Sequence, residues 1–348
     1  MSTSGAGALP MALDSRPRLP SGTVLDGSYR VEGVLGAGGF GIVYLATDVN
    51  LETQVAVKEY YPSLHTQRDA SYQIRSRYMF QRKSYERGLT SFLREARTLA
   101  RFEHPSIVRV TRVFEANKTA YMVMRLETGH NFEDWLRTLT RSPTQKELDT
   151  FLSALLSAME MLHAAGFLHR DIAPDNIIIR SDGLPVLLDF GAVISKQRSL
   201  RFAKHDVIIK PRYSAPEHYD ANSAARTEGP WSDIYSLGAT LFRAVKGIPP
   251  AEAHIRLRED YLPTAVDPGP HSGYRRNFLD AIDACVKLQP KERPQSVLDL
   301  RDILSGYARN RPATRQEWRP TQYQGYRQAG IVMMTLSMLL LIAAMLLI

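Results

Sequence analysis

The chain has 348 residues, of which 44% are hydrophobic and 23% are charged, a composition that allows a sizeable globular core. Its formal net charge is +8, but the sequence carries no nucleic-acid recognition motif that would use this charge, so we expect no nucleic-acid partner. The single cysteine, Cys285, excludes an intramolecular disulfide and favours a reducing compartment. It lies in the apolar run AIDACVKL, which predicts a buried small hydrophobic residue.

The first half of the chain has the pattern of a small β-rich unit with one helix. Residues 1–27 contain no continuous apolar stretch, which excludes a secretory signal and predicts a flexible segment. Three β-branched runs with glycines between them (YRVEGVLG, GIVYLATD and QVAVKEY) predict antiparallel strands joined by tight turns. Residues 59–88 show no clean periodicity and predict a long insert. SFLREARTLARF then has apolar positions at helical spacing, and IVRVTRVFEAN and TAYMVMRLE predict two more strands.

After Glu127 the pattern becomes helical. NFEDWLRTL and ELDTFLSALLSAMEMLHAAG both have helical spacing, and Gly166 is a suitable stop for the second helix. A short strand in LPVLLDF follows, and further helices are predicted from Trp231 to about Tyr307. We therefore expect an α+β protein with a small β-rich lobe and a larger helical lobe.

A glycine-rich motif, GAGGFG, occupies residues 36–41 between the first two predicted strands. Glycines allow the backbone to approach phosphate oxygens and to donate N–H groups to them. Because the motif joins two strands and does not open a helix, it disfavours a dinucleotide-binding fold. A plain hairpin turn is the alternative interpretation.

Two charged residues follow at positions that suggest a shared role. Lys58 ends an apolar strand, so its ammonium is expected to point into a cleft. Glu95 on the predicted amphipathic helix is the natural carboxylate to hold it. An exposed helix carboxylate is the alternative for Glu95.

The string HRDIAPDN at residues 169–176 is followed by DFG at residues 189–191. It supplies one carboxylate that could orient a hydroxyl nucleophile, and an amide and a second carboxylate that could hold Mg²⁺, a cation that prefers oxygen ligands. With the glycine motif and Lys58, these strings resemble the eukaryotic-type protein kinases that bacteria also carry. The resemblance covers residues 28–307 and includes SAPE at 214–217, WSDIYSLG at 231–238 and ERP at 292–294.

The resemblance implies a bilobal protein-kinase-like fold and ATP-dependent transfer of the γ-phosphoryl group to Ser/Thr hydroxyls of protein substrates. Asp171 would orient the hydroxyl and accept its proton, Lys58 held by Glu95 would contact the α- and β-phosphates, and Asn176 and Asp189 would bind Mg²⁺, with Mn²⁺ as an alternative ion. Asp233 of the 231–238 string would hold the backbone of the catalytic loop, the HRDIAPDN string at residues 169–176. Arg293 would pair with Glu217. The nucleotide-binding residues would be Leu35, Gly36, Gly38, Gly39, Phe40, Gly41, Val43, Ala56, Lys58, Met124, Leu126, Glu127 and Ile178.

Two departures from the family pattern fall close together. Ala173 stands where serine/threonine kinases usually have Lys. Lys210 stands where these kinases usually have Thr in the activation segment, the stretch from DFG to SAPE (residues 189–217). We expect Lys210 to reach towards Asp171 and supply the missing ammonium in catalysis; the alternative is that it points to solvent.

Regulation is expected at the activation segment. Arg170 precedes the catalytic aspartate, and in the family this arginine often binds a phosphate on the activation loop. We expect autophosphorylation on Ser195 or Ser199, which a homodimer would allow. The insert at residues 59–88 is either a regulatory or docking element or an inert loop.

The C-terminus predicts a membrane anchor. Residues 330–348 carry no charge, and a helix of 19 residues at about 1.5 Å per residue could cross a hydrocarbon core of about 30 Å. A buried core helix is the alternative. The linker at residues 308–329 is rich in arginine, so the positive-inside rule predicts a single-pass protein of the inner (plasma) membrane with a cytoplasmic kinase domain. The main rival function is a membrane-tethered pseudokinase scaffold, but Lys58, Asp171, Asn176 and Asp189 are all retained.

Overall fold

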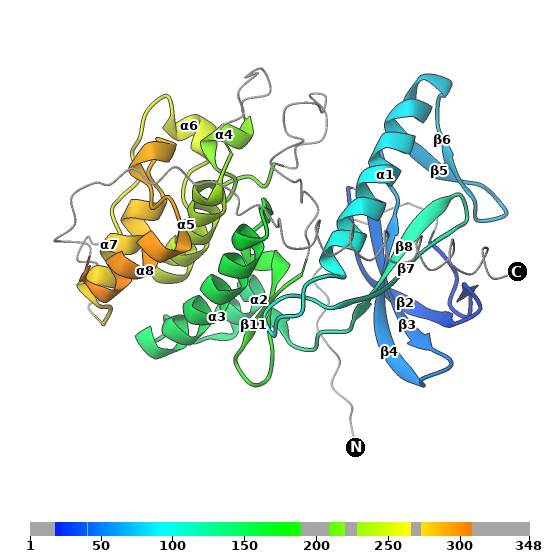
Figure 1. Ribbon diagram of the computed structural model, residues 1–348, viewed down its shortest axis with the longest axis horizontal. Coiled ribbons are helices and arrows are strands. Elements are labelled where there is room, and N and C mark those ends of the chain that lie inside the picture. The colour runs from blue at the N-terminus through cyan, green and yellow to red at the C-terminus, as the bar shows by residue number, and fades with distance from the viewer. Residues whose placement is uncertain (1–17, 40, 189–208, 220–227, 266–272, 308–348) are drawn as a thin grey trace, which may run out of the picture.

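The computed structural model describes residues 18–39, 41–188, 209–219, 228–265 and 273–307. These residues form a β-rich lobe and a helical lobe (Figure 1). The expected architecture of a small β-rich lobe with one main helix and a large helical lobe is therefore confirmed. No helix among these residues is long and apolar enough to cross a membrane, and the predicted span at 330–348 lies outside them.

The β-rich lobe is built on a six-stranded sheet in the order β1-β2-β3-β4-β8-β7. All of its neighbouring strands are antiparallel, as the β-branched runs predicted. The strands are β1 (Val24–Leu25), β2 (Tyr29–Gly38), β3 (Gly41–Asp48), β4 (Thr53–Tyr60), β7 (Val110–Ala116) and β8 (Thr119–Arg125).

The insert after β4 has more structure than its sequence pattern predicted. It forms a hairpin of β5 (Thr66–Arg68) and β6 (Ile74–Ser76), a short turn η1 (Met79–Gln81), and the first turns of α1 (Arg82–Leu99). The helix thus begins nine residues before the predicted start at residue 91. Its early turns, RKSYERGLT, are mostly polar and bury only Tyr85, so they carry little apolar periodicity.

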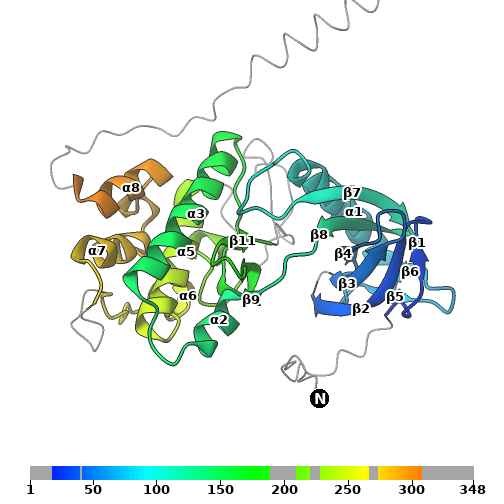
Figure 2. The ribbon, with the colours of Figure 1, turned by 90° about the horizontal axis from the view of Figure 1, so that it is seen from below.

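The helical lobe surrounds α5, which is buried along most of its length. Helix α7 packs on α5, and α8 packs on both α7 and α3 (Figures 1 and 2). The helices are α2 (Phe132–Thr138), α3 (Gln145–Ala164), α4 (Pro216–Tyr219), α5 (Pro230–Lys246), α6 (Ala253–Arg256), α7 (Arg276–Cys285) and α8 (Val297–Ser305), with short turns η2 (Pro174–Asn176) and η4 (Pro290–Glu292). A small sheet is formed by β9 (His130–Asn131), β10 (Ile177–Ile179) and β11 (Pro185–Leu187).

Two predictions for this lobe are confirmed. Gly166 follows the end of α3 with a φ of 80°, the left-handed conformation in which glycine commonly stops a helix. Cys285 is fully buried, and burial raises the pKa of its thiol, so it is packed as a hydrophobic residue. A Cβ on Gly238 of α5 would lie 2.3 Å from the Cβ of Cys285, so α7 approaches α5 this closely only because residue 238 is glycine.

A buried ion pair joins the insert to the sheet. Arg68 of β5 donates to Glu59 of β4 at 2.5 Å, and neither side chain is exposed to solvent. The hydroxyls of Tyr44 and Tyr121 also donate to Glu59, at 3.0 and 2.6 Å, so both carboxylate oxygens are satisfied. The guanidinium of Arg68 also lies 5.1 Å from the ring centre of Tyr61 and donates to a backbone carbonyl. The hairpin is therefore attached to the sheet by a hydrogen-bonded charge pair as well as by apolar packing.

Replacing Arg68 should strongly destabilise the protein. In Arg68→Met, Glu59 would stay buried without its cation, which typically costs about 3–5 kcal/mol. Arg75→Met is the matched control, because the Arg75–Asp69 pair belongs to the same hairpin but Arg75 is 57% exposed, and we expect a loss of under about 1 kcal/mol. Urea unfolding of both variants measures the difference. Equal losses would show that the buried pair does not hold the hairpin.

Candidate active site

Several of the predicted nucleotide-binding residues lie on one face of the sheet. In the strand register, Val43 is opposite Lys58, and Ala56 is opposite Met124. Directly opposite residues of antiparallel strands point to the same side, and so do residues two apart on one strand. Val43, Ala56, Lys58 and Met124 therefore share a face of the sheet. Leu35 lies at an irregularity in β2, half exposed, beside this group.

The glycine-rich motif closes the hairpin between β2 and β3. Gly38 is opposite Gly41, and Gly36 is opposite Val43. A Cβ on Gly41 would lie 2.3 Å from the carbonyl oxygen of Glu59, so only glycine allows β3 to approach β4 this closely. The carbonyl of Gly39 accepts a hydrogen bond from the backbone N–H of Ser63 at 3.1 Å, which attaches the loop to the start of the insert. Phe40, also predicted to bind nucleotide, lies outside the described residues.

Helix α1 packs against the end of β4 through Tyr60, two residues after Lys58. The ring of Tyr60 lies 5.5 Å from that of Tyr85 and 5.6 Å from that of Phe92. A Cβ on Gly88 would lie 2.0 Å from the Tyr60 hydroxyl, so the helix has a glycine at this point of contact. Tyr85, Gly88 and Phe92 are spaced three and four residues apart and therefore form one face of the helix.

Glu95 continues this face of α1, three residues after Phe92. Tyr60 points to the same side of β4 as Lys58, so the structure places Glu95 and Lys58 on the same side of the sheet. Both side chains are buried, Lys58 being 8% exposed and Glu95 7% exposed. Charged side chains are rarely buried to this extent unless they are paired. That Glu95 anchors Lys58 stays a prediction.

Three of the predicted nucleotide-binding residues lie at or near the connection between the lobes. Met124 is buried in β8, and Leu126 is partly buried directly after this strand. The carboxylate of Glu127 accepts a hydrogen bond from Arg180 at 2.7 Å and lies 3.8 Å from Arg125, so this side chain is paired within the protein. Ile178, another predicted nucleotide-binding residue, is partly buried in β10.

The catalytic loop is held by a buried carboxylate on α5. Asp233 accepts hydrogen bonds from the backbone N–H groups of His169 at 2.8 Å and Arg170 at 2.7 Å, which confirms the role implied by the resemblance. His163 of α3 contacts the same carboxylate at 2.8 Å. Burial acts to raise the pKa of Asp233, but the hydrogen bond and charge of His163 outweigh it, and the pKa is lowered overall. Asp233 is therefore held as a carboxylate, the form that accepts all these bonds.

This arrangement positions Asp171 and Asn176. The backbone N–H of Asp171 donates to Nδ1 of His169 at 3.2 Å, and the Asp171 side chain is buried. Nδ2 of Asn176 donates to the carbonyl of Asp171 at 3.0 Å, which leaves the Asn176 amide oxygen for another partner. An amide oxygen is a suitable Mg²⁺ ligand, so Asn176 fits its predicted role. Asp189, the other predicted ligand, lies outside the described residues.

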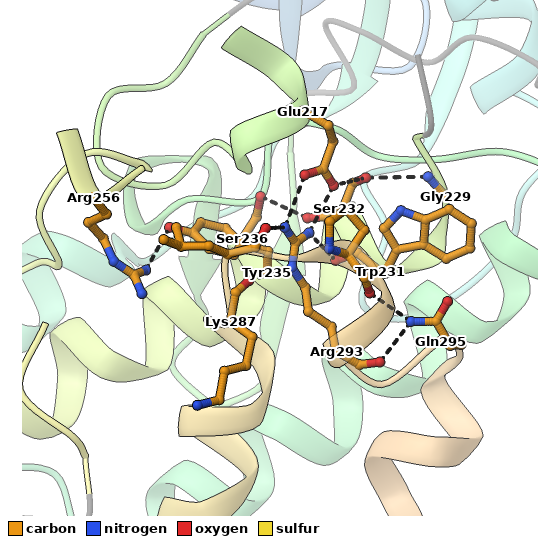
Figure 3. Close-up of polar contacts among 12 residues, drawn as sticks. Glu217, Gly229, Trp231, Ser232, Tyr235, Ser236, Arg256, Lys287, Arg293 and Gln295 are labelled. Atoms are coloured by element: carbon orange, nitrogen blue, oxygen red, sulfur yellow. Dashed lines mark hydrogen bonds and ion pairs between the residues drawn. The ribbon is translucent and has the colours of Figure 1, made fainter. Parts of the chain in front are cut away.

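The end of the activation segment is fixed by the pair that the resemblance implied. Arg293 donates to both oxygens of Glu217, at 2.8 and 3.0 Å, and Ser232 donates to Glu217 at 2.6 Å (Figure 3). Arg293 also donates to three backbone carbonyls and lies 4.9 Å from the ring centre of Tyr235. Although burial acts to raise the pKa of Glu217, the hydrogen bond and charge of Arg293 lower it. This buried pair ties the SAPE segment to the start of α5.

Arg170 already has an anionic partner within the chain. Its backbone adopts a φ of 68°, a left-handed conformation that is uncommon for residues other than glycine. Its guanidinium forms an ion pair with Glu228, and both side chains are nearly buried. Glu228 belongs to none of the motifs recognised in the sequence, and no local pattern marks it. Ser195 and Ser199, the predicted phosphorylation sites, lie outside the described residues.

Lys210 contacts the catalytic loop through a residue to which the sequence assigned no role. Its ammonium lies 2.5 Å from Oδ2 of Asp175, the residue directly before Asn176. The backbone N–H of Lys210 is held by the hydroxyl of Ser214 at 2.8 Å. Lys210 therefore links the activation segment to the loop that carries Asp171. A catalytic contribution from this ammonium stays a prediction.

Gly88 offers a test of how tightly α1 must approach β4. Alanine usually stabilises a helix interior by about 1 kcal/mol relative to glycine. In Gly88→Ala, however, the new methyl group would meet the Tyr60 hydroxyl, and such overpacking typically costs about 1–3 kcal/mol. We expect a lower melting temperature and slower phosphotransfer, because Glu95 moves with the helix.

The double variant Gly88→Ala with Tyr60→Phe is the control, since it removes the oxygen that the methyl group would meet. It should recover part of both losses in thermal unfolding and in phosphotransfer assays. A single Gly88→Ala variant more stable than the parent would contradict the close contact.

The chain is similar to known proteins over most of its length. A profile described as the protein kinase domain matches residues 29–304. Serine/threonine-protein kinase PknB of Mycobacterium leprae is 29% identical over 80% of this chain and 42% of its own length. Serine/threonine-protein kinase PknA of Mycobacterium tuberculosis is 32% identical over 65% of this chain and 48% of its own length.

The chain therefore spans less than half the length of these two curated relatives. A solved structure described as the PpkA-294 apo form is similar with a TM-score of 0.72 and 35% identity, covering 82% of this chain and 99% of that one. The chain belongs to the eukaryotic-type serine/threonine protein kinase family found in bacteria.

Proposed function

We propose that this protein transfers the γ-phosphoryl group of ATP to serine or threonine hydroxyls of other proteins. The observation that carries the proposal is the catalytic loop, in which Asp233 fixes the backbone of His169 and Arg170 beside Asp171. Such a fixed loop is what a positioned general base requires. The names of the curated relatives support serine/threonine specificity.

In this mechanism the catalytic and binding residues have separate roles. The Asp171 carboxylate accepts a hydrogen bond from the substrate hydroxyl, orients it and takes its proton as the phosphoryl group is transferred. Lys58 neutralises charge on the phosphates from its buried position in β4. Asn176 and Asp189 would hold Mg²⁺, which would offset the charge on the migrating phosphoryl group when bound.

A membrane-tethered pseudokinase is the second candidate. Its support is limited to the departures at Ala173 and Lys210, because the residues required for phosphotransfer are all present. Burying charged groups such as Lys58, Glu95 and Asp171 is costly, and a protein that no longer transferred phosphate would have no need to keep them, which favours an active enzyme.

We also propose that the enzyme is anchored in the plasma membrane by residues 330–348, with the kinase domain on the cytoplasmic side. The support is the uncharged run of 19 residues and the arginine-rich linker before it.

Asp171→Asn tests the proposed phosphotransfer. The amide keeps the shape of the side chain but cannot accept the proton, so we expect kcat to fall by about 10²-fold or more with ATP binding largely retained. Labelled ATP and a generic protein substrate measure turnover, and a fluorescent nucleotide measures binding. Asp182→Asn, in the exposed turn before β11, is the isosteric control and should turn over normally. Parental activity in Asp171→Asn would contradict the assignment.

Deleting residues 330–348 tests the anchor. The parent should partition with the membrane fraction, whereas the truncated protein should appear in the soluble fraction with its kinase activity intact. A protein lacking residues 1–17 is the control and should stay with the membrane. Membrane association of the truncated protein would show that the anchor lies elsewhere.

A further inference from the structure

An open pocket of about 470 Å³ lies beside the catalytic loop. Its charged lining residues are Glu133 and Arg137 of α2, Asp175 of the catalytic loop, Lys210 of the activation segment and Arg243 of α5. Asp175 follows Asp171 by four residues, so the pocket lies close to where the acceptor hydroxyl would be oriented. A bound substrate chain, which extends about 3.3 Å per residue, would bring side chains near the acceptor to this pocket.

Both carboxylates that line the pocket are already paired. Glu133 accepts two hydrogen bonds from Arg243, at 2.8 and 3.1 Å, and also pairs with Arg137 at 3.2 Å. Asp175 pairs with Lys210 at 2.5 Å. A lysine or arginine of a substrate would have to compete with Arg243 and Arg137 at Glu133, where both oxygens are engaged, whereas at Asp175 only Oδ1 is left for it.

The cations of the pocket, by contrast, have more N–H donors than their present partners use. Arg137 is 55% exposed, and its only ion pairs in the described part of the chain are with Glu133 at 3.2 Å and Asp134 at 3.7 Å. A guanidinium has five N–H donors and an ammonium has three. Arg137 can keep Glu133 and Asp134 and bind a third anion, and Lys210 can keep Asp175 and bind a second. Arg243 is less available, since it also donates to the carbonyl of Gly247.

We infer that this pocket selects protein substrates that carry an acidic side chain, Asp or Glu, close to the phosphorylated hydroxyl, and that Arg137 and Lys210 recognise it. The inference rests on the proposed kinase activity and concerns the substrate class of the same site. Three cations and two carboxylates line the pocket, with Asp134 behind Arg137 at 3.7 Å, so the lining itself favours a further carboxylate over a further cation. Because these groups are partly exposed, the preference should be modest, about fivefold in kcat/KM.

The test uses the full-length protein in detergent and a set of peptides that differ at one position. Each peptide has one serine and carries Asp, Gln or Lys at a chosen position on either side of it. We expect the Asp peptide to be phosphorylated about fivefold more efficiently than the Gln peptide at one or more positions, and the Lys peptide less efficiently than both.

Charge reversal in the pocket identifies the residue responsible. Arg137→Glu should invert the preference between the Asp and Lys peptides, and Arg137→Gln should abolish most of it. Arg276→Glu is the matched control, because Arg276 is also exposed and also pairs with an acidic residue one helical turn away, but it lies on α7. This control changes net charge equally and should keep the preference for Asp.

Equal rates for the three peptides, or a preference for Lys, would overturn the inference while leaving the proposed function standing. The same preference in Arg137→Glu as in the parent would exclude Arg137 as its source and overturn the assignment. Failure to phosphorylate every peptide and a generic protein substrate would count against the proposed function itself, and the inference would fall with it.

Discussion

The catalytic loop depends on one buried carboxylate, Asp233. Asp233 accepts hydrogen bonds from the backbone N–H groups of His169 and Arg170. Arg170 has the left-handed φ that a residue with a Cβ rarely adopts. An unsatisfied buried donor costs about 1–3 kcal/mol, and such a backbone conformation costs about the same, so this loop shape needs support from outside the loop. Asp233 lies 63 residues after Arg170 and provides that support from the most buried helix of the lobe. The positions of Asp171 and Asn176 follow from it.

The same physical device recurs at two other places. Glu217 with Arg293 fixes the end of the activation segment, and Glu59 with Arg68 fixes the insert hairpin. Each pair is buried; Glu217 and Arg293 are 76 residues apart, and Glu59 and Arg68 lie on separate sheets nine residues apart. Desolvation offsets much of the attraction in such pairs, so they add little net stability, but loss of one partner is costly and this disfavours other arrangements. We interpret the three carboxylates as specifying how loops without strong secondary-structure propensity are placed against rigid elements.

The sequence predicted some features of the structure and not others. The strands β2, β3 and β4 followed from β-branched runs between glycines, and the roles of Asp233 and Glu217 followed from motifs typical of the family. The early start of α1 did not, because its first turns face solvent and bury little. The pairing of Lys210 with Asp175 and of Arg170 with Glu228 could not be predicted, since each joins two charged residues that no periodicity relates. A glycine within a helical segment, Gly88, was the one local signal of the close contact with Tyr60.

Burial separates the cations around the catalytic loop into two groups. Arg170 is nearly inaccessible and is paired with a nearly inaccessible Glu228, so any new anion would have to displace a carboxylate that cannot readily move into water. Lys210 and Arg137 are paired with carboxylates that are partly exposed, and such pairs contribute at most about 1 kcal/mol each. Anions can therefore exchange at Lys210 and Arg137 far more easily than at Arg170. The buried cation is suited to holding the loop in one shape, whereas the exposed cations are suited to reading the charge of what binds beside it.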